Sequence, residues 1–208
     1  GAEWLHQLYT RADATFTGRA TVPVLWDKKT ATIVNNESAD IVRIFNSGFG
    51  ELARNDIDLY PASLREEIDQ VNAQIYPMLN NGVYRAGFAT TQLSYAEAVD
   101  DVFSMLNTLE SRFTTEDYLC GGQLTEADIR LFVTLVRFDA AYHGLFKCNL
   151  RKLAEYPNLD RYLRNMLAVP GIRETVNIEH IKQGYYSIKA LNPNGIVPQG
   201  PDLSAWGL

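Results

Sequence analysis

Cysteine is scarce in this sequence. Cys120 and Cys148 are the two present, and they lie far apart without forming a C-x-x-C pair. Neither a disulfide framework nor a zinc site is therefore predicted. We expect both to be small buried thiols. His6, His143 and His180 are too dispersed to indicate a metal site, so no metal is expected.

The sequence also lacks long apolar runs and clusters of basic residues. No run approaches the ~20 apolar residues that a membrane-spanning helix needs, and the first residues do not have the pattern of a signal peptide. We therefore expect no membrane partner and a cytoplasmic protein. The net charge is −6, the pI is about 5.1, and lysine and arginine form no run. A nucleic-acid partner is therefore not expected.

The composition is that of an ordinary globular protein, with 46% hydrophobic and 21% charged residues and room for one or two cores. The clearest predicted helix is Leu124–Asp139, which reads LTEADIRLFVTLVRFD. Thr125 and Asp128 have the spacing of a capping box, in which each side chain accepts a hydrogen bond from the other residue's backbone N–H. Apolar residues on nearly every side predict that this helix lies at the centre of a helical domain. Many soluble proteins contain such a helix, so it indicates fold and not function.

The first part of the chain has a different pattern. Residues 1–18 predict a short helix and a loop, and Arg19–Asp27 and Thr30–Val34 predict an antiparallel hairpin. Pro23 cannot donate to a sheet, so we place it at the strand's start or edge and consider its bond to the preceding valine a candidate for the cis form. Ser38–Asn46 is predicted to be a helix. A lone two-stranded hairpin is marginal in water, so we expect either that a further α/β half precedes residue 1 or that the hairpin has other cover.

From residue 60 onward the apolar residues recur at helical spacing. The remaining predicted helices are one capped by Ser63 that reaches Leu79 with a kink at Pro77, one opened by a Ser94–Glu97 capping box that reaches Phe113, one that starts at Tyr156-Pro157-Asn158 and stops at Pro170-Gly171, and one over Ile172–Gln183. The tail, Leu191–Leu208, is predicted to be irregular.

Several motifs together carry a family resemblance. TVPVLWDKK, NNES, NNGVYRAGF, LTEADIRL, VRFD followed by Tyr142, FKC and NPNG resemble the soluble glutathione transferases, and within them the xi class, the glutathionyl-hydroquinone reductases. The likeness covers nearly the whole chain. It implies a mostly α fold in which a partial thioredoxin-like α/β segment, a β-hairpin plus a helix, precedes an all-α glutathione-transferase C-terminal helical domain. Residues 1–50 would be the C-terminal half of the glutathione-binding domain, and residues 51–208 the helical domain with its irregular tail.

The resemblance also implies what lies outside this sequence. In the family, an upstream β-α-β segment carries a C-P-W motif whose cysteine is the nucleophile, and a further upstream tryptophan helps to hold glutathione. Both would precede Gly1. We therefore expect the 208-residue chain alone to have no turnover. Cys120 has no neighbouring histidine or dense positive charge, so we do not expect it to replace the nucleophile.

By resemblance, the segment before and including the hairpin's proline holds the cysteinyl part of glutathione. A cis Val22–Pro23 bond would turn the Val22 N–H and C=O out of the ladder, toward a peptide ligand. The ordinary alternative is a turn proline with no ligand. The implied contact residues are Arg19, Ala20, Thr21, Val22 and Pro23.

Glu37 and Ser38 stand at a predicted helix start, where free N–H groups and the helix dipole favour a carboxylate. By resemblance, Glu37 faces the ammonium group of the γ-glutamyl end of glutathione and Ser38 faces its carboxylate. The alternative is a plain N-cap. Glutathione is the expected co-substrate, with no metal or prosthetic group.

Tyr84, Tyr142 and Tyr185 are the predicted catalytic residues. Tyrosines in helical proteins usually serve packing, with the hydroxyl toward water. By resemblance, Tyr84 exchanges a proton with an aromatic quinol-type substrate, while Tyr142 and Tyr185 hydrogen-bond in the active site and help to lower the pKa of the thiol. A phenol with a pKa of about 10 can donate a proton at neutral pH and take it back.

The implied activity is glutathione-dependent reduction of glutathionyl-hydroquinones through a cysteine–glutathione mixed disulfide, in a homodimer. One alternative is a non-catalytic binding or scaffold module, since transferase-like folds without the thiol dock partners. Another is a general transferase acting on electrophiles, with a glutathione-activating serine or tyrosine in the missing segment. The sequence does not reveal the physiological quinone.

Overall fold

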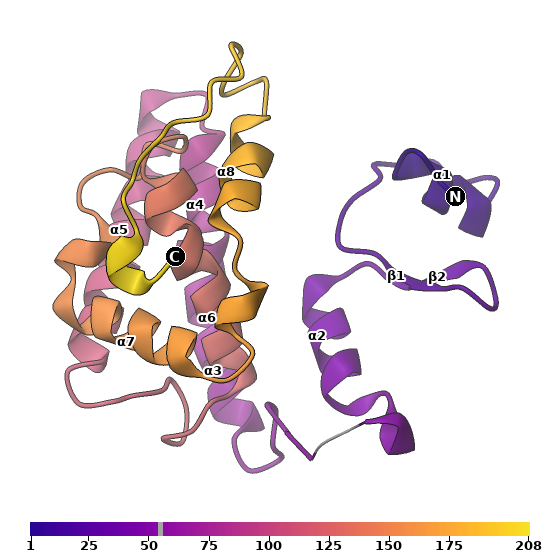
Figure 1. The fold of residues 1–208 in the computed structure, drawn as a ribbon, viewed down its shortest axis with the longest axis horizontal. Helices are drawn as coiled ribbons and strands as arrows, with labels where there is room; N and C mark the ends of the chain where they lie inside the picture. The colour runs from indigo at the N-terminus through magenta and orange to yellow at the C-terminus, as the bar shows by residue number, and fades with distance from the viewer. Residues whose placement is uncertain (54–55) are drawn as a thin grey trace. The chain divides into compact units, whose positions relative to one another are not determined.

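The computed structural model describes residues 1–53 and 56–208 and divides them into two compact units, Gly1–Pro61 and Ala62–Leu208 (Figure 1). The first unit contains α1 (His6–Ala12), β1 (Leu25–Asp27), β2 (Thr32–Asn35) and α2 (Ser38–Ser47). The second contains α3 (Arg65–Ile75), α4 (Gly82–Gly87), α5 (Gln92–Arg112), α6 (Glu126–Arg137), α7 (Pro157–Ala168) and α8 (Ile178–Tyr186). None of the described helices is long and apolar enough to cross a membrane.

The hairpin of the first unit is confirmed, although its strands are shorter than predicted. β1 and β2 pair antiparallel, with Trp26 opposite Ile33. The Asp27 carboxylate closes the turn by accepting hydrogen bonds from the N–H groups of Lys29 (2.7 Å) and Thr30 (3.1 Å). Pro23 precedes the paired residues of β1, because its missing N–H suits it to the approach and not to the ladder. The bond between Val22 and Pro23 is cis.

The central helix of the second unit is confirmed. Thr125 and Asp128 form the capping box, with the Thr125 N–H 2.9 Å from an Asp128 carboxylate oxygen. The other carboxylate oxygen accepts from the Leu119 N–H at 2.9 Å and the Tyr162 hydroxyl at 3.0 Å. α6 contacts α3 and α7, and α7 runs across the long helices (Figure 1). Asp128 therefore joins three segments of the core as well as starting α6.

Two helix starts differ from the prediction. α3 begins at Arg65 with Leu64 as its N-cap and no capping side chain, so Ser63 does not cap it. α5 is capped by Thr91, whose hydroxyl accepts from the Ser94 N–H at 3.1 Å. Thr91 and Ser94 are both good cap residues, and the earlier one wins because it adds almost a full turn to the helix.

The stretch predicted as one helix over Ile172–Gln183 is also different. A 3₁₀ turn, Arg173–Thr175, is separated from α8, which Asn177 caps by accepting from the His180 N–H at 2.9 Å. The helix predicted to reach Leu79 ends in a π-helical turn, Tyr76–Asn80, which contains Pro77. Helical structure continues past the other expected endpoint, Asp139, through a second π-helical turn, Phe138–Tyr142. α4 follows the first of these directly, where the sequence indicated only a stop.

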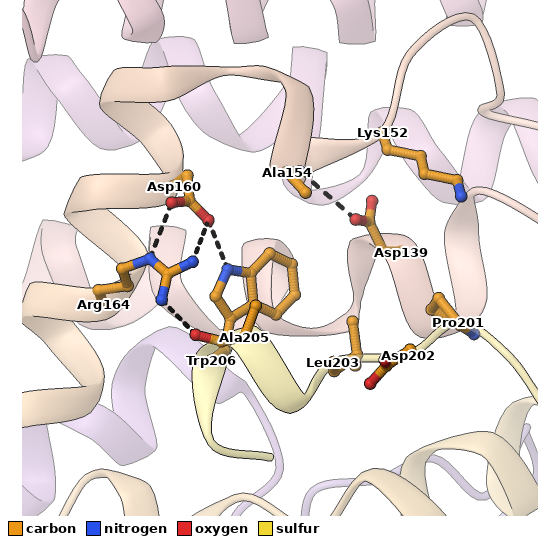
Figure 2. Close-up of a pocket in the computed structure, with 10 residues that line it drawn as sticks. All are labelled: Asp139, Lys152, Ala154, Asp160, Arg164, Pro201, Asp202, Leu203, Ala205 and Trp206. Atoms are coloured by element: carbon orange, nitrogen blue, oxygen red, sulfur yellow. Dashed lines mark hydrogen bonds and ion pairs between the residues drawn. The ribbon is translucent and has the colours of Figure 1, made fainter.

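The irregular tail is attached to α7 (Figure 2). The Trp206 indole N–H donates to the Asp160 carboxylate at 2.5 Å, and the Arg164 guanidinium bonds the Ala205 carbonyl. Arg164 also pairs with Asp160 at 2.8 Å. The buried Trp206 and Leu203 border a hollow of about 450 Å³ beside these groups. The tail thus completes the core although it has little regular structure.

Candidate active site

Three tyrosines from three separate segments meet at their hydroxyl groups. Tyr84 lies on α4, Tyr142 ends the π-helical turn after α6, and Tyr185 lies on α8. The Tyr185 hydroxyl is 2.5 Å from that of Tyr84 and 2.8 Å from that of Tyr142. The three predicted catalytic residues therefore form one hydrogen-bonded chain. Their catalytic role stays a prediction.

Close packing beside α4 builds this cluster. Phe146 is fully buried, stacks on the Tyr142 ring at 5.3 Å and meets the Tyr84 ring edge-on at 5.2 Å. A Cβ added at Gly87 would lie 2.4 Å from the Phe146 ring. The glycine of the VYRAGF motif is therefore needed for α4 to approach Phe146. Sequence reasoning missed Phe146 as a site residue, although it lies in the FKC motif that supported the resemblance.

Burial controls the protonation of two of these phenols. It raises the pKa of Tyr142, and the neighbouring tyrosines add to the effect. Burial likewise raises the pKa of Tyr185, against smaller lowering effects of its hydrogen bond to Tyr142 and of the Arg137 charge. Both phenols are therefore protonated at neutral pH and can act as donors. Tyr84, with 37% of its surface exposed, is the solvent-exposed end of the three linked hydroxyl groups.

A hollow of about 510 Å³ opens beside the outer tyrosines. Its size lies within the range of small-molecule sites. Apolar side chains and aromatic rings form much of its wall, which suits an aromatic ring, and two basic side chains are present. The lining residues are Tyr84, Arg137, His180, Ile181, Gly184, Tyr185 and Ile188.

The predicted glutathione contacts all lie in the first unit. Arg19, Ala20 and Thr21 lead into the cis bond, and the Val22 residue is 75% exposed. Glu37 is the N-cap of α2, and Ser38 is the first helical residue. No capping side chain occupies this helix start, so its N–H groups remain suited to a carboxylate. These roles also stay predictions.

Tyr9 ties the two predicted contact segments together, and sequence reasoning missed it. Its hydroxyl donates to the Thr21 carbonyl at 2.7 Å, and the Asn36 amide N–H donates to the same hydroxyl at 3.2 Å. Tyr9 is 4% exposed. One buried phenol therefore links the residue before Val22 to the residue before Glu37. No sequence motif marks a tyrosine in a short first helix as a link between two distant segments.

The two cysteines are buried, as predicted. Burial raises the pKa of Cys120 to about 11 and that of Cys148 to about 12. Both are therefore thiols at neutral pH and poor nucleophiles. Among the residues that the structure describes, no group of histidine, cysteine and carboxylate side chains could hold a metal ion.

Comparison with known proteins identifies the class of protein to which this chain belongs. The family model for the glutathione S-transferase C-terminal domain matches residues 92–165. The chain is 54% identical to the glutathionyl-hydroquinone reductase PcpF of Sphingobium chlorophenolicum, over all of the chain and 67% of the relative. It is 52% identical to the glutathionyl-hydroquinone reductase YqjG of Escherichia coli, over 96% of the chain and 61% of the relative.

Solved structures agree. The glutathione-bound structure of YqjG from E. coli matches with a TM-score of 0.93 and 52% identity, over 97% of this chain and 66% of that one. The glutathione transferase Xi of Phanerochaete chrysosporium matches with a TM-score of 0.93 and 51% identity, over the same shares of each chain. The chain therefore belongs to the Xi class of glutathione transferases, the family of the glutathionyl-hydroquinone reductases. The predicted family and fold class are confirmed, and the chain spans about two thirds of the length of these relatives.

Proposed function

We propose that the protein containing this chain reduces glutathionyl-hydroquinones to hydroquinones at the expense of glutathione. The chain of hydroxyl groups through Tyr84, Tyr185 and Tyr142 is the observation that carries the proposal, because it supplies phenolic protons beside a hollow suited to an aromatic ring. The names of two relatives more than 50% identical to the chain support it. Glutathione as co-substrate is supported by the glutathione-bound relative.

Within this proposal, each unit has its own task. Residues 1–50 are the C-terminal half of a thioredoxin-like domain, where the backbone of Val22 pairs with the cysteinyl part of glutathione. Glu37 and Ser38 receive its γ-glutamyl end. Residues 51–208 are the helical domain, whose tyrosines serve the aromatic part of the substrate. The exposure of Val22 and the uncapped start of α2 support these assignments.

The proposed reaction proceeds in two steps, formation of a mixed disulfide and its reduction by glutathione. The thiolate of the upstream cysteine implied by the family attacks the glutathione sulfur, the bond from that sulfur to the aromatic carbon breaks, and a mixed disulfide forms. The aromatic carbon takes the electron pair and a proton from Tyr84, giving the hydroquinone. The thiol of a second glutathione gives its proton to the Tyr84 phenolate, and the resulting thiolate attacks the mixed disulfide, which releases oxidised glutathione and restores the cysteine thiolate. Tyr185 and Tyr142 are protonated donors behind Tyr84 and hold its hydroxyl in place.

The test is turnover of a glutathionyl-hydroquinone by the full-length protein, followed by chromatography of the products. We expect one hydroquinone and one oxidised glutathione per substrate consumed. The 208-residue chain alone is expected to release no hydroquinone. Absence of hydroquinone release by the full-length protein would overturn the proposal.

We also propose a cytoplasmic homodimer, as the family resemblance implies. Exposed apolar side chains on the helical domain, such as Tyr76 and Leu93, would be natural positions for such an interface. Light scattering of the full-length protein measures the oligomeric state, and the mass of a monomer would contradict this part of the proposal.

A further inference from the structure

The hollow beside the tyrosines contains a positive charge that the reaction just proposed does not use. Arg137, at the end of α6, supplies this charge, and the imidazole of His180, on α8, also lines the hollow. None of the residues that line the hollow is acidic. The hollow therefore combines apolar walls with a basic side.

Arg137 has no carboxylate partner in the described parts of the chain. Its guanidinium donates to the Val133 carbonyl at 2.6 Å, which is a neutral acceptor one helical turn back. Several other arginines of the same domain do have ion pairs, such as Arg130 with Glu126 at 3.3 Å on the same helix, while Arg173, which does not line the hollow, also bonds backbone carbonyls. A half-buried guanidinium without a counter-charge favours an anionic ligand, because part of its hydration is already lost.

The position of Arg137 relates this charge to the reacting groups. Arg137 and Tyr185 border the same hollow, and the arginine charge lowers the pKa of Tyr185, against the larger effect of burial. Tyr185 in turn bonds the Tyr84 hydroxyl. An aromatic ring that reaches Tyr84 would therefore have an edge or substituent near Arg137.

We infer that this hollow selects aromatic rings that carry a carboxylate, and that Arg137 is the residue that recognises it. The inference rests on the proposed function and narrows its substrate class to glutathione conjugates of carboxylated hydroquinones. The planar guanidinium matches a carboxylate with two parallel hydrogen bonds, while Ile181 and Ile188 offer apolar contact to the ring. The N–H of His180 provides a second donor in either protonation state.

The experiment compares a matched pair of substrates in the full-length protein. One is the glutathione conjugate of a hydroquinone carboxylic acid, and the other is its methyl ester. We expect the wild type to favour the acid by about three- to tenfold in kcat/KM, as for a partly exposed charge pair. Arg137→Gln should bring the ratio to about one, and Arg137→Lys should keep part of it. Raising the salt concentration should lower the wild-type preference.

Lys182→Gln is the matched control. Like Arg137→Gln, it removes one positive charge, in this case from α8. The Lys182 ammonium donates to the Gln199 carbonyl at 2.7 Å and does not line the hollow. The acid preference of this variant should equal that of the wild type. Equal rates for acid and ester in the wild type would overturn the inference, and so would an unchanged preference in Arg137→Gln. If Arg137→Gln raises the KM for glutathione and leaves the preference intact, the charge serves a glutathione carboxylate and the inference is wrong.

A binding measurement separates this inference from the proposed function. Thioethers of glutathione with a carboxyphenyl ring, or with its methyl ester, contain no hydroquinone and are not reduced. Calorimetry on the full-length protein should give the acid a dissociation constant about three- to tenfold lower, with the difference lost in Arg137→Gln. If neither hydroquinone conjugate is reduced, the proposed function fails, while this ratio still decides the inference. If Arg137→Gln does not fold, Arg137→Lys and the salt dependence of the wild type decide it.

Discussion

The hydroxyl groups of Tyr84 and Tyr185 lie 2.5 Å apart, although 101 positions separate the two residues in the chain. Tyr185→Phe removes the central hydroxyl and leaves Tyr84 and Tyr142 without their shared partner. We expect kcat of the full-length protein to fall by about 10- to 100-fold, because the proton donor loses its orientation. The KM for glutathione should not change.

The adjacent Tyr186→Phe is the control, since Tyr186 is outside this chain of hydroxyl groups. Its kcat should stay within about twofold of the wild type. Steady-state rates at saturating glutathione compare the two variants. A Tyr185→Phe variant as fast as Tyr186→Phe would contradict a catalytic role for the linked hydroxyl groups.

Tyr9→Phe tests the link between the predicted glutathione contacts. The substitution keeps the ring and its contact with Phe16, but it removes the hydroxyl that bonds Thr21 and Asn36. We expect stability to fall by about 1–2 kcal/mol and the dissociation constant of glutathione to rise by about three- to tenfold. Denaturant unfolding and calorimetry with glutathione measure the two effects. Tyr76→Phe alters an exposed tyrosine of the helical domain and should leave both unchanged.

Asp128→Ala tests the capping box. The variant loses the acceptor of the Thr125 and Leu119 N–H groups and of the Tyr162 hydroxyl, all in the core. We expect the unfolding free energy to fall by at least about 3 kcal/mol, because buried donors are left unpaired. Asp100→Ala, at an exposed position on α5, should change it by less than about 0.5 kcal/mol. A small loss in Asp128→Ala on urea unfolding would show that the cap is dispensable.

The thiols provide a prediction about pH. The thiolate is the reactive form, and raising the pKa of Cys120 from 9.0 to about 11 lowers its thiolate fraction by about 100-fold near pH 8. Cys148, with a pKa of about 12, should be slower still. Labelling of both by iodoacetamide should accelerate as the pH rises toward these values, and unfolding in guanidinium chloride should remove the protection. Rapid labelling of Cys120 or Cys148 in the folded protein near pH 7, located by peptide mapping, would contradict this prediction.

Local signals predicted the elements whose cause is local. The capping box of α6, the proline start of α7 and the turn at Asp27 each depend on a few adjacent residues, and each is present. Ser63 and Ser94 were wrong as helix starts: α3 begins without a side-chain cap, and Thr91, three residues before Ser94, caps α5 instead. The break before α8 was missed for a similar reason: Asn177 restarts the helix within a continuous helical pattern.

The sequence by itself determined the family and the fold class and made the bond before Pro23 a candidate for the cis form, because motifs and backbone chemistry depend on consecutive residues. Only the tertiary structure decided that three distant phenols share hydrogen bonds, that Tyr9 joins Thr21 to Asn36, and that Arg137 borders a hollow in which no described lining residue is a carboxylate. Such contacts depend on how helices pack. Packing is a property of many side chains together, and no short stretch of sequence contains it.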